Sequence, residues 1–382
     1  MTQHLPLCPA YLVTNDAFCD NAMQSLLLDG RPPQPIRLRS RLGPIAAGSW
    51  QDAGEICKQH GFRAGWAQVK QLSLAARHTG FIKDLHNRHV DILFLWRGLL
   101  GRAGLASLAS RAAKVPCVYF ERGPLPGWLQ IDLNGVNARS SIPRDPAFFA
   151  RWRQQAGNIR DWRNLSTSLV ARTPRRDLVA QHARTDWTDE GPFLFCPFQL
   201  NAPRDMLPDG GWVSDPAELV RVLARASGNL PDGWHLRIKP HPNAPGDLAR
   251  LLAPHLGPKL KMDRDTNSLD QLAASQGVVT VNSAMGLEAF FYDKPVIVLG
   301  DSYYSDFGRS QIANSDQQLA ELLSRPDRLS FDQQARDDLM SFLFNDFFVP
   351  EPELKDGRFT VATLLARHDR HLALLDQNQP LA

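Results

Sequence analysis

The chain has 382 residues, of which 43% are hydrophobic and 22% charged, a composition typical of a folded globular protein and not of a disordered or fibrous one. This length suits two domains, each able to bury a core of its own. The 43 basic and 40 acidic side chains nearly balance, with a net charge of +3, which argues against the strongly basic surface of a nucleic-acid binder.

The cysteines and the absence of long apolar runs bear on where in the cell the protein is expected to lie. The five cysteines contain no CxxC pair, and an odd number cannot all pair within one chain, which favours a reducing environment. The first residues lack the basic flank and apolar run of a secretory signal. No apolar run approaches the roughly 20 residues that span a bilayer. We therefore expect a cytoplasmic protein whose contact with the inner-membrane face is at most peripheral.

The first clear α/β unit lies in the N-terminal third of the chain. Residues 90–96 predict a buried strand, 101–113 a helix and 115–120 the next strand, which leads directly into Glu121 and Arg122. In an open α/β sheet, ligands bind beyond the carboxyl ends of the strands. These two charged residues are therefore candidates for a functional site.

A second α/β series begins at residue 193, after a polar stretch that predicts linking amphipathic helices. Strands are expected at 193–198, 235–239, near 260, 278–281 and 296–299, and helices at 216–226, 247–252, 268–275, 287–291, 331–344 and 361–375. The alternation predicts an α/β fold with two Rossmann-like lobes. We expect the first lobe with its linking helices at 1–190, the second at 191–330, and C-terminal helices at 331–382 that pack back on the first lobe.

Two strand ends in the second lobe carry candidate phosphate ligands. The strand at 278–281 runs into Asn282 and Ser283 before a helix, whose N–H groups and dipole favour an anion, and the Ser283 hydroxyl adds a donor. Helix capping is an equally good interpretation of Ser283. The other strand ends in Lys239-Pro240-His241-Pro242, where two prolines fix the direction of His241. A lone histidine at a strand end is more often an ordinary loop residue.

Together these motifs resemble the capsule-biosynthesis β-Kdo glycosyltransferases, where Kdo is 3-deoxy-manno-octulosonic acid. The resemblance covers roughly residues 90–310 and is carried by YFERG at 119–123, GVNARSS at 135–141 and the segment 278–308. It implies a GT-B-like fold with a cleft between the two lobes. It also implies an enzyme that transfers Kdo from CMP-Kdo with retention of configuration through a carboxylate nucleophile.

The resemblance further implies roles for individual residues. Glu121 would activate the acceptor hydroxyl and Asp205 would be the nucleophile, with Asp209 the next candidate and a turn-forming role the alternative for Asp205. His241 would stabilise the departing phosphate and Arg122 would pair with the carboxylate of an acid sugar. The implied donor-binding set is Arg122, Lys239, His241, Asn282, Ser283, Gly286 and Glu288.

No metal or other cofactor is expected. Asp263-Arg264-Asp265 has the Asp-x-Asp form that metal-dependent transferases use, but we interpret it as structural because a CMP-sugar carries only one phosphate. The expected partners are a nucleotide sugar and a glycolipid or saccharide acceptor, with peripheral contact to anionic inner membrane or capsule-assembly proteins and none to nucleic acid. Alternatives are a transferase using CMP-sialic acid or a UDP-sugar, and a non-catalytic scaffold of an envelope polysaccharide assembly complex.

Overall fold

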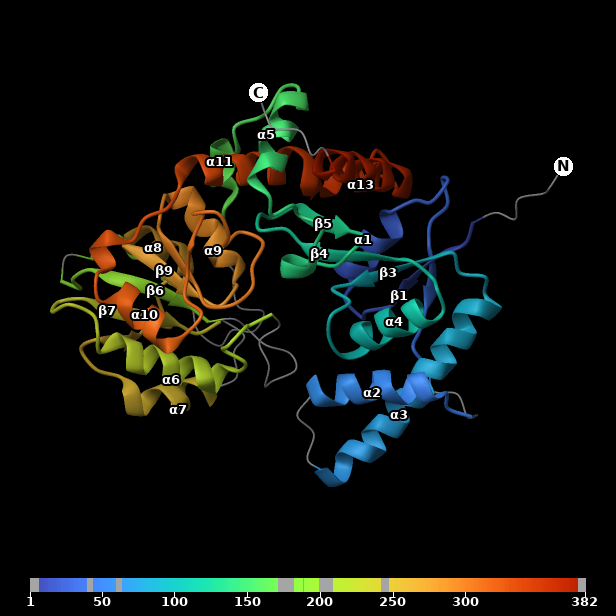
Figure 1. Cartoon of the computed structure of the whole chain (residues 1–382), viewed down its shortest axis with the longest axis horizontal. Helices are drawn as coiled ribbons and strands as arrows, with labels where there is room; N and C mark the ends of the chain where they lie inside the picture. Colours follow the sequence, from blue (N-terminus) through green and yellow to red (C-terminus); the bar gives the residue numbers. More distant parts are fainter. Residues whose placement is uncertain are drawn as a thin grey trace. The chain divides into compact units, whose positions relative to one another are not determined.

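The computed structural model describes residues 7–39, 44–59, 64–170, 182–187, 189–198, 209–241 and 247–376. The chain forms two compact units, each treated by itself below (Figure 1). Unit 1 comprises Met1–Gly123, Gly127–Gly157 and Phe342–Ala382, and unit 2 comprises Pro124–Pro126 and Asn158–Ser341. The chain therefore leaves unit 1, builds unit 2 and then returns to unit 1.

These limits differ from the predicted boundaries at residues 190 and 330. The stretch that follows Gly157 packs within unit 2, where Trp162 lies edge-to-face on Phe291 at 5.2 Å between ring centroids. Arg336, beyond the predicted end of the second lobe, is fully buried with its guanidinium 3.9 Å from the centroid of the Phe290 ring. These aromatic contacts place both segments in unit 2, and the composition of the sequence did not indicate them.

Unit 1 is built on one six-stranded sheet. Its strands are β1 (Pro9–Leu12), β2 (Gln34–Ile36), β3 (Ile92–Trp96), β4 (Cys117–Arg122), β5 (Trp128–Asp132) and β12 (Val349–Pro350), in the order β12-β5-β4-β3-β1-β2. The four strands β1 to β4 run parallel, whereas β5 pairs antiparallel with β4 and with β12. Its helices are α1 (Ala17–Ser25), α2 (Ala47–Gln59), α3 (Ala64–Asn87), α4 (Gly101–Ala112), α5 (Pro146–Gln155), α12 (Glu351–Lys355) and α13 (Val361–Leu375).

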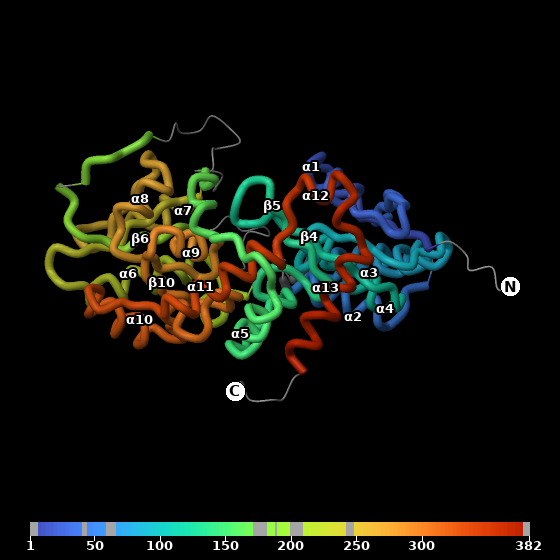
Figure 2. Tube along the Cα trace, turned by 90° about the horizontal axis from the view of Figure 1, so that it is seen from above, coloured from blue at the N-terminus to red at the C-terminus, as the bar shows by residue number. Residues whose placement is uncertain are grey.

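Helices cover both faces of this sheet, which explains why its central strands are apolar throughout. In β3, Ile92 and Phe94 join a buried cluster with α1, α12 and α13, while Leu93 and Leu95 join a second cluster with α3 and α4. The tail is bound to the rest of unit 1 by Arg367, whose buried guanidinium donates to the backbone oxygens of Phe347, at 2.6 Å, and of Ile131. Helix α13 also lies beside α5 (Figure 2).

Unit 2 contains an all-parallel six-stranded sheet. Its strands are β6 (Phe193–Pro197), β7 (His235–Lys239), β8 (Leu260–Met262), β9 (Gly277–Thr280), β10 (Val296–Val298) and β11 (Gln311–Ile312), in the order β11-β10-β9-β6-β7-β8. Its helices are α6 (Pro216–Ser227), α7 (Asp247–Leu252), α8 (Ser268–Ala274), α9 (Ala284–Glu288), α10 (Asp316–Leu323) and α11 (Gln333–Phe342), the last ending at the border with unit 1. Numbered within the unit, the strands follow the order 6-5-4-1-2-3 of a Rossmann fold.

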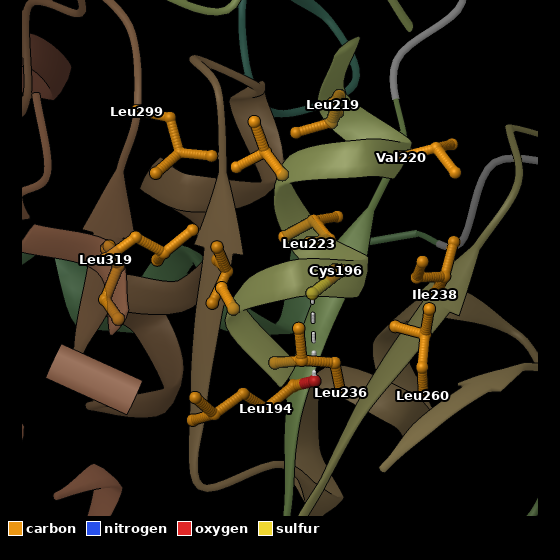
Figure 3. Packing of buried hydrophobic residues seen from close by; sticks show 14 of the residues in the cluster. Leu194, Cys196, Leu219, Val220, Leu223, Leu236, Ile238, Leu260, Leu299 and Leu319 are labelled. Carbon is orange, nitrogen blue, oxygen red and sulfur yellow. Dashed lines mark hydrogen bonds between the residues drawn. The ribbon is translucent and has the colours of Figure 1, made fainter. Parts of the chain in front are cut away.

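One face of this sheet packs on α6, α7 and α10. Leu194 and Cys196 of β6 point into this cluster with Leu223 of α6 and Ile238 of β7 (Figure 3). Helix α6 presents its apolar stripe to the sheet, as the buried positions Leu219, Val220, Val222, Leu223 and Ala226 show. The carboxyl ends of the parallel strands are thereby fixed side by side.

The predicted α/β, GT-B-like class with two Rossmann-like lobes is confirmed at the level of the two units. Several elements coincide with the predictions to within a residue or two, among them β7, α7 and α13. The helix predicted at 287–291 is present but begins three residues earlier, because Ser283 caps α9 at Ala284, and its second half is a 3-10 turn, Ala289–Tyr292. Of the linking helices predicted for 144–190, the described residues contain α5 and a 3-10 segment, Trp162–Ser168.

Candidate functional site

The sheet of unit 2 places most of the predicted donor-binding residues at one edge. Strands β6 and β9 are neighbours, yet β6 is followed by a helix on one face of the sheet and β9 by a helix on the other. A ligand crevice is expected beyond the carboxyl ends at such a topological switch point. Ser283 follows β9 and His241 follows β7, on either side of β6. Two strand spacings put these exits about 10 Å apart.

Ser283 is held in place from three directions. Its N–H donates to the Thr280 hydroxyl at 3.2 Å, and its carbonyl oxygen accepts from the Tyr304 hydroxyl at 2.5 Å. Its own hydroxyl accepts from the N–H of Met285 at 3.3 Å, which makes it the N-cap of α9. A capping hydroxyl keeps its own proton for another acceptor, so the cap and the predicted phosphate contact are compatible.

Asn282 joins the loops around this edge. Its side-chain N–H groups donate to the backbone oxygens of Asp209, at 3.3 Å, and of Asp301, at 3.2 Å. The N–H of Asp301 also donates to the oxygen of Asp209 at 2.7 Å. Asn282 therefore ties the end of β9 to the loop after β10 and to the segment entering α6. Its predicted role as a donor ligand remains a prediction.

Lys239 and His241 lie at the end of β7. The Lys239 side chain is buried, and its ammonium donates to the backbone oxygens of Arg264, at 3.1 Å, and of Thr266, at 2.6 Å. Burial lowers the Lys239 pKa. These bonds commit the ammonium to the loop between β8 and α8, a structural role that sequence reasoning missed. His241 is half-buried, and its assignment to the phosphate remains a prediction.

Gly286 and Glu288 belong to α9. A Cβ at position 286 would lie 2.4 Å from the Tyr304 hydroxyl oxygen, so packing requires this glycine. Glu288 is buried, and its charge adds to burial in raising the pKa values of Tyr303 and Tyr304. Asp205, the predicted nucleophile, lies outside the described residues, whereas Asp209 is described and adopts a left-handed backbone with φ 55°.

In the Asp263-Arg264-Asp265 segment, the Asp263 carboxylate has structural hydrogen-bond partners. The carboxylate of Asp263 accepts from the Arg237 guanidinium at 3.0 Å and from the N–H groups of Asp265, at 3.1 Å, and Thr266, at 3.0 Å. Burial opposes ionisation of Asp263, but these bonds outweigh it and lower its pKa. Within the described part of the chain, no group of three or more histidine, cysteine or acidic side chains could hold a metal ion.

Glu121 and Arg122 are the last two residues of β4 in unit 1. Glu121 is buried, and its carboxylate accepts from Arg97 Nε at 2.5 Å and from the N–H of Arg122 at 2.8 Å. Arg97 directly follows β3, so the carboxyl ends of two parallel strands bring this pair together. The sequence analysis missed Arg97, although its position after a predicted strand was a usable signal.

The Arg122 guanidinium lies over the Phe18 ring, 3.8 Å from its centroid. Phe18 belongs to the first turn of α1, which Asp16 caps through the N–H groups of Phe18 and Cys19. Burial opposes ionisation of Asp16, but these N–H donors and the Arg122 charge outweigh it and lower its pKa. Arg122 is therefore a preoriented cation near a carboxylate, which suits the predicted contact with an acid sugar without testing it.

Comparisons with known proteins agree with the predicted family. Residues 165–345 match the family described as capsule polysaccharide biosynthesis protein. Protein FixF of Sinorhizobium fredii (strain NBRC 101917 / NGR234) is 31% identical over 189 residues, which are 49% of this chain and 43% of that protein, so the alignment spans less than half of this relative.

Two solved structures from Thermosulfurimonas dismutans KpsC are also similar. Its β-Kdo 2,4-transferase is 19% identical with a TM-score of 0.44, covering 66% of this chain and 79% of the other. Its β-Kdo 2,7-transferase is 13% identical with a TM-score of 0.43, covering 87% and 89%. The match over residues 165–345, which contains almost all of unit 2, agrees with the predicted link to capsule polysaccharide biosynthesis.

Proposed function

We propose that this chain, whose residues 165–345 match the capsule polysaccharide biosynthesis family, is a glycosyltransferase that moves Kdo from CMP-Kdo to a saccharide or glycolipid acceptor. The observation that carries the proposal is the switch point of unit 2. There, the braced Ser283 and the end of β7 at His241 flank the exit of β6. Nucleotides bind at this place in sheets of this order.

In this proposal unit 2 holds the donor. The Ser283 hydroxyl, positioned by its own backbone bonds, donates to the phosphate of CMP-Kdo, and His241 stabilises the charge that develops as CMP leaves. Asn282 keeps the loops after β9 and β10 in register around the nucleotide. Glu288, buried one turn into α9, shapes the pocket for the ribose or base.

Unit 1 supplies the acceptor side. Glu121 accepts the proton of the attacking hydroxyl, and Arg122 pairs with an acidic sugar group.

The proposed nucleophile is Asp205. It attacks the anomeric carbon as the bond to CMP breaks, and the acceptor oxygen then displaces the carboxylate, so two inversions give net retention. No metal is needed in this scheme.

Nucleotide release measures the donor. Purified protein is incubated with CMP-Kdo, CMP-sialic acid and common UDP-sugars, each with and without a Kdo-bearing acceptor, and released CMP or UDP is quantified. We expect acceptor-dependent CMP release from CMP-Kdo alone. Release of nucleotide from another donor would change the proposed donor but leave the protein a glycosyltransferase. No release from any donor would favour the non-catalytic scaffold alternative.

Mass spectrometry after mixing with CMP-Kdo tests the nucleophile. We expect a Kdo adduct on the peptide that contains Asp205, and Asp205→Ala should abolish both adduct and transfer. Asp209→Ala, a carboxylate on the same stretch of chain, is the control and should keep the adduct. An adduct that persists in Asp205→Ala and disappears in Asp209→Ala would reassign the nucleophile, and an inverted product would end the two-step scheme.

Peripheral membrane contact is part of the proposal, and α2 and α3 support it. Trp50 of α2 and Trp66, Val69 and Leu72 of α3 are 40%, 69%, 58% and 53% exposed. Tryptophan favours the membrane–water interface. Of the helices in the described ranges, none is both long and apolar enough to cross a bilayer. We expect the protein to sediment with phosphatidylglycerol vesicles and the Trp66→Ser variant to sediment less. A wild-type protein that stays in the supernatant would refute the membrane contact.

A further inference from the structure

Arg97 lies at the topological switch point of unit 1. Strands β1 and β3 are parallel neighbours, but the helix after β1 packs on one face of the sheet and the helix after β3 on the other. The order of β1 to β5 matches a doubly wound sheet that binds its ligand beyond the carboxyl ends of these two strands. Arg97 is the first residue after β3, so it borders the place where unit 1 should bind a ligand.

The backbone of Arg97 is strained. Its φ is 66° and that of Gly98 is 73°, so two successive residues lie in the left-handed region. Gly98 has a packing reason, since a Cβ there would lie 2.5 Å from the Tyr119 ring. Glycine would also adopt the conformation of Arg97 without strain, and a side chain kept at such a position points to function.

The Arg97 side chain orients the carboxylate of Glu121. Its Nε donates to one oxygen at 2.5 Å, while the N–H of Arg122 donates to the other at 2.8 Å. The exposed fraction of the Arg97 side chain is 64%, against 9% for Glu121. The guanidinium therefore stays open to solvent while it holds a buried carboxylate, and this is the arrangement of a side chain that orients its partner without being packed into the core itself.

We propose that Arg97 is a positioning residue that holds the Glu121 carboxylate toward the acceptor hydroxyl. The inference rests on the proposed transferase function, in which Glu121 is the acceptor base. With one oxygen fixed by the backbone of β4 and the other by the guanidinium, the carboxylate cannot rotate away. Loss of this alignment lowers the rate of transfer more than it lowers binding, because misplacing a catalytic group by about 1 Å can cost about 100-fold in rate.

Four variants separate positioning from folding. Arg97→Gly removes the side chain and relieves the strain, Arg97→Gln removes the charge, and Arg97→Lys keeps the charge but loses the Nε donor. Arg102→Gln makes the same charge change at an exposed position of α4 and is the matched control. Thermal unfolding, kcat and donor KM are measured for each, together with carbodiimide-coupled labelling of Glu121 by glycine ethyl ester, read by mass spectrometry.

We expect Arg97→Gly to lower the Tm by less than about 5 °C, because the relieved strain offsets the lost ion pair, while kcat falls about 10- to 100-fold and the donor KM changes less than about 3-fold. Arg97→Gln should behave alike in kcat, Arg97→Lys should recover part of it, and Arg102→Gln should match the wild type. Labelling of Glu121 should rise at least about 5-fold in Arg97→Gly and Arg97→Gln only, because the carboxylate loses its partner.

Other outcomes overturn the inference. A Tm of Arg97→Gly more than about 5 °C below the wild type, with kcat per folded molecule unchanged, would make Arg97 a structural residue. If the wild type transfers no sugar from any donor, the proposed function fails, and the labelling decides the positioning role alone. Equal labelling of Glu121 in the wild type and in Arg97→Gln would then refute it.

Discussion

Gly286→Ala should destabilise unit 2 through a single contact. The new Cβ would lie 2.4 Å from the Tyr304 hydroxyl oxygen and 2.8 Å from the ring carbon that carries it. Tyr304 is 1% exposed and donates to the Ser283 carbonyl, so the ring cannot swing out. Overpacking of this kind costs about 1–3 kcal/mol. Because the same contact holds Ser283, the donor KM should rise as well.

A double-mutant cycle tests this reasoning. Tyr304→Phe loses one hydrogen bond, about 1 kcal/mol, but removes the closest clashing atom. The double variant should therefore be more stable than the sum of the single effects by about 1–2 kcal/mol. Urea unfolding followed by tryptophan fluorescence supplies the free energies, and Gly228→Ala, whose Cβ would lie 3.4 Å from its nearest neighbour, is the control. Additive effects, or a Gly286→Ala variant of wild-type stability, would refute the argument.

Three further predictions concern unit 2. Ser283→Ala should lose about 1 kcal/mol of stability with its helix cap and raise the donor KM, and an unchanged KM would leave only the cap. Burial and nearby cations lower the pKa of His235 from about 6.5 to about 4. The contribution of neutral His235 to the free energy of unfolding is therefore fully present above pH 6.5 and falls by up to about 3 kcal/mol as the pH drops to 4. His235→Phe should abolish this loss, whereas a wild-type urea midpoint that stays constant over that range would contradict it. Glu190→Ala should cost about 3–5 kcal/mol in urea unfolding, because it leaves buried Arg237 without its 2.5 Å partner, and a smaller loss would show that Asp263 suffices.

The sequence analysis located the strands of unit 2 well because parallel strands buried on both faces are continuous apolar runs bounded by glycine or proline. His235–Lys239 coincides with its prediction despite three polar side chains, because Pro240 marks where the strand must end. Strand order was the missing information. It depends on contacts between distant segments, and it is strand order that places Ser283 and Arg97 at the topological switch points of their sheets.

Side-chain roles were harder to predict than positions. Lys239 was predicted as a donor ligand, which stays a prediction, and the structure adds a role that the motif did not indicate: its ammonium donates to two backbone oxygens of a neighbouring loop. Gly286 was placed in the donor-binding set, and the structure gives it a packing role as well, because the ring of Tyr304 lies against it. A motif gives residue types and spacing, but the partner of a buried polar or small residue usually comes from another part of the chain.

The return of the chain from unit 2 to unit 1 affects how the protein forms during synthesis. Strand β12 and helix α13 are made after unit 2, yet β12 completes the edge of the first sheet and Arg367 of α13 bonds to the oxygen of Ile131 in β5. Domains fold in order as they leave the ribosome. Apart from the short segment Pro124–Pro126, unit 2 is one continuous stretch from Asn158 to Ser341, so it can fold first. Unit 1, begun earlier, must wait for α13. Ribosome-bound chains from which residues up to about 345 have emerged should therefore resist protease in unit 2 but not in unit 1.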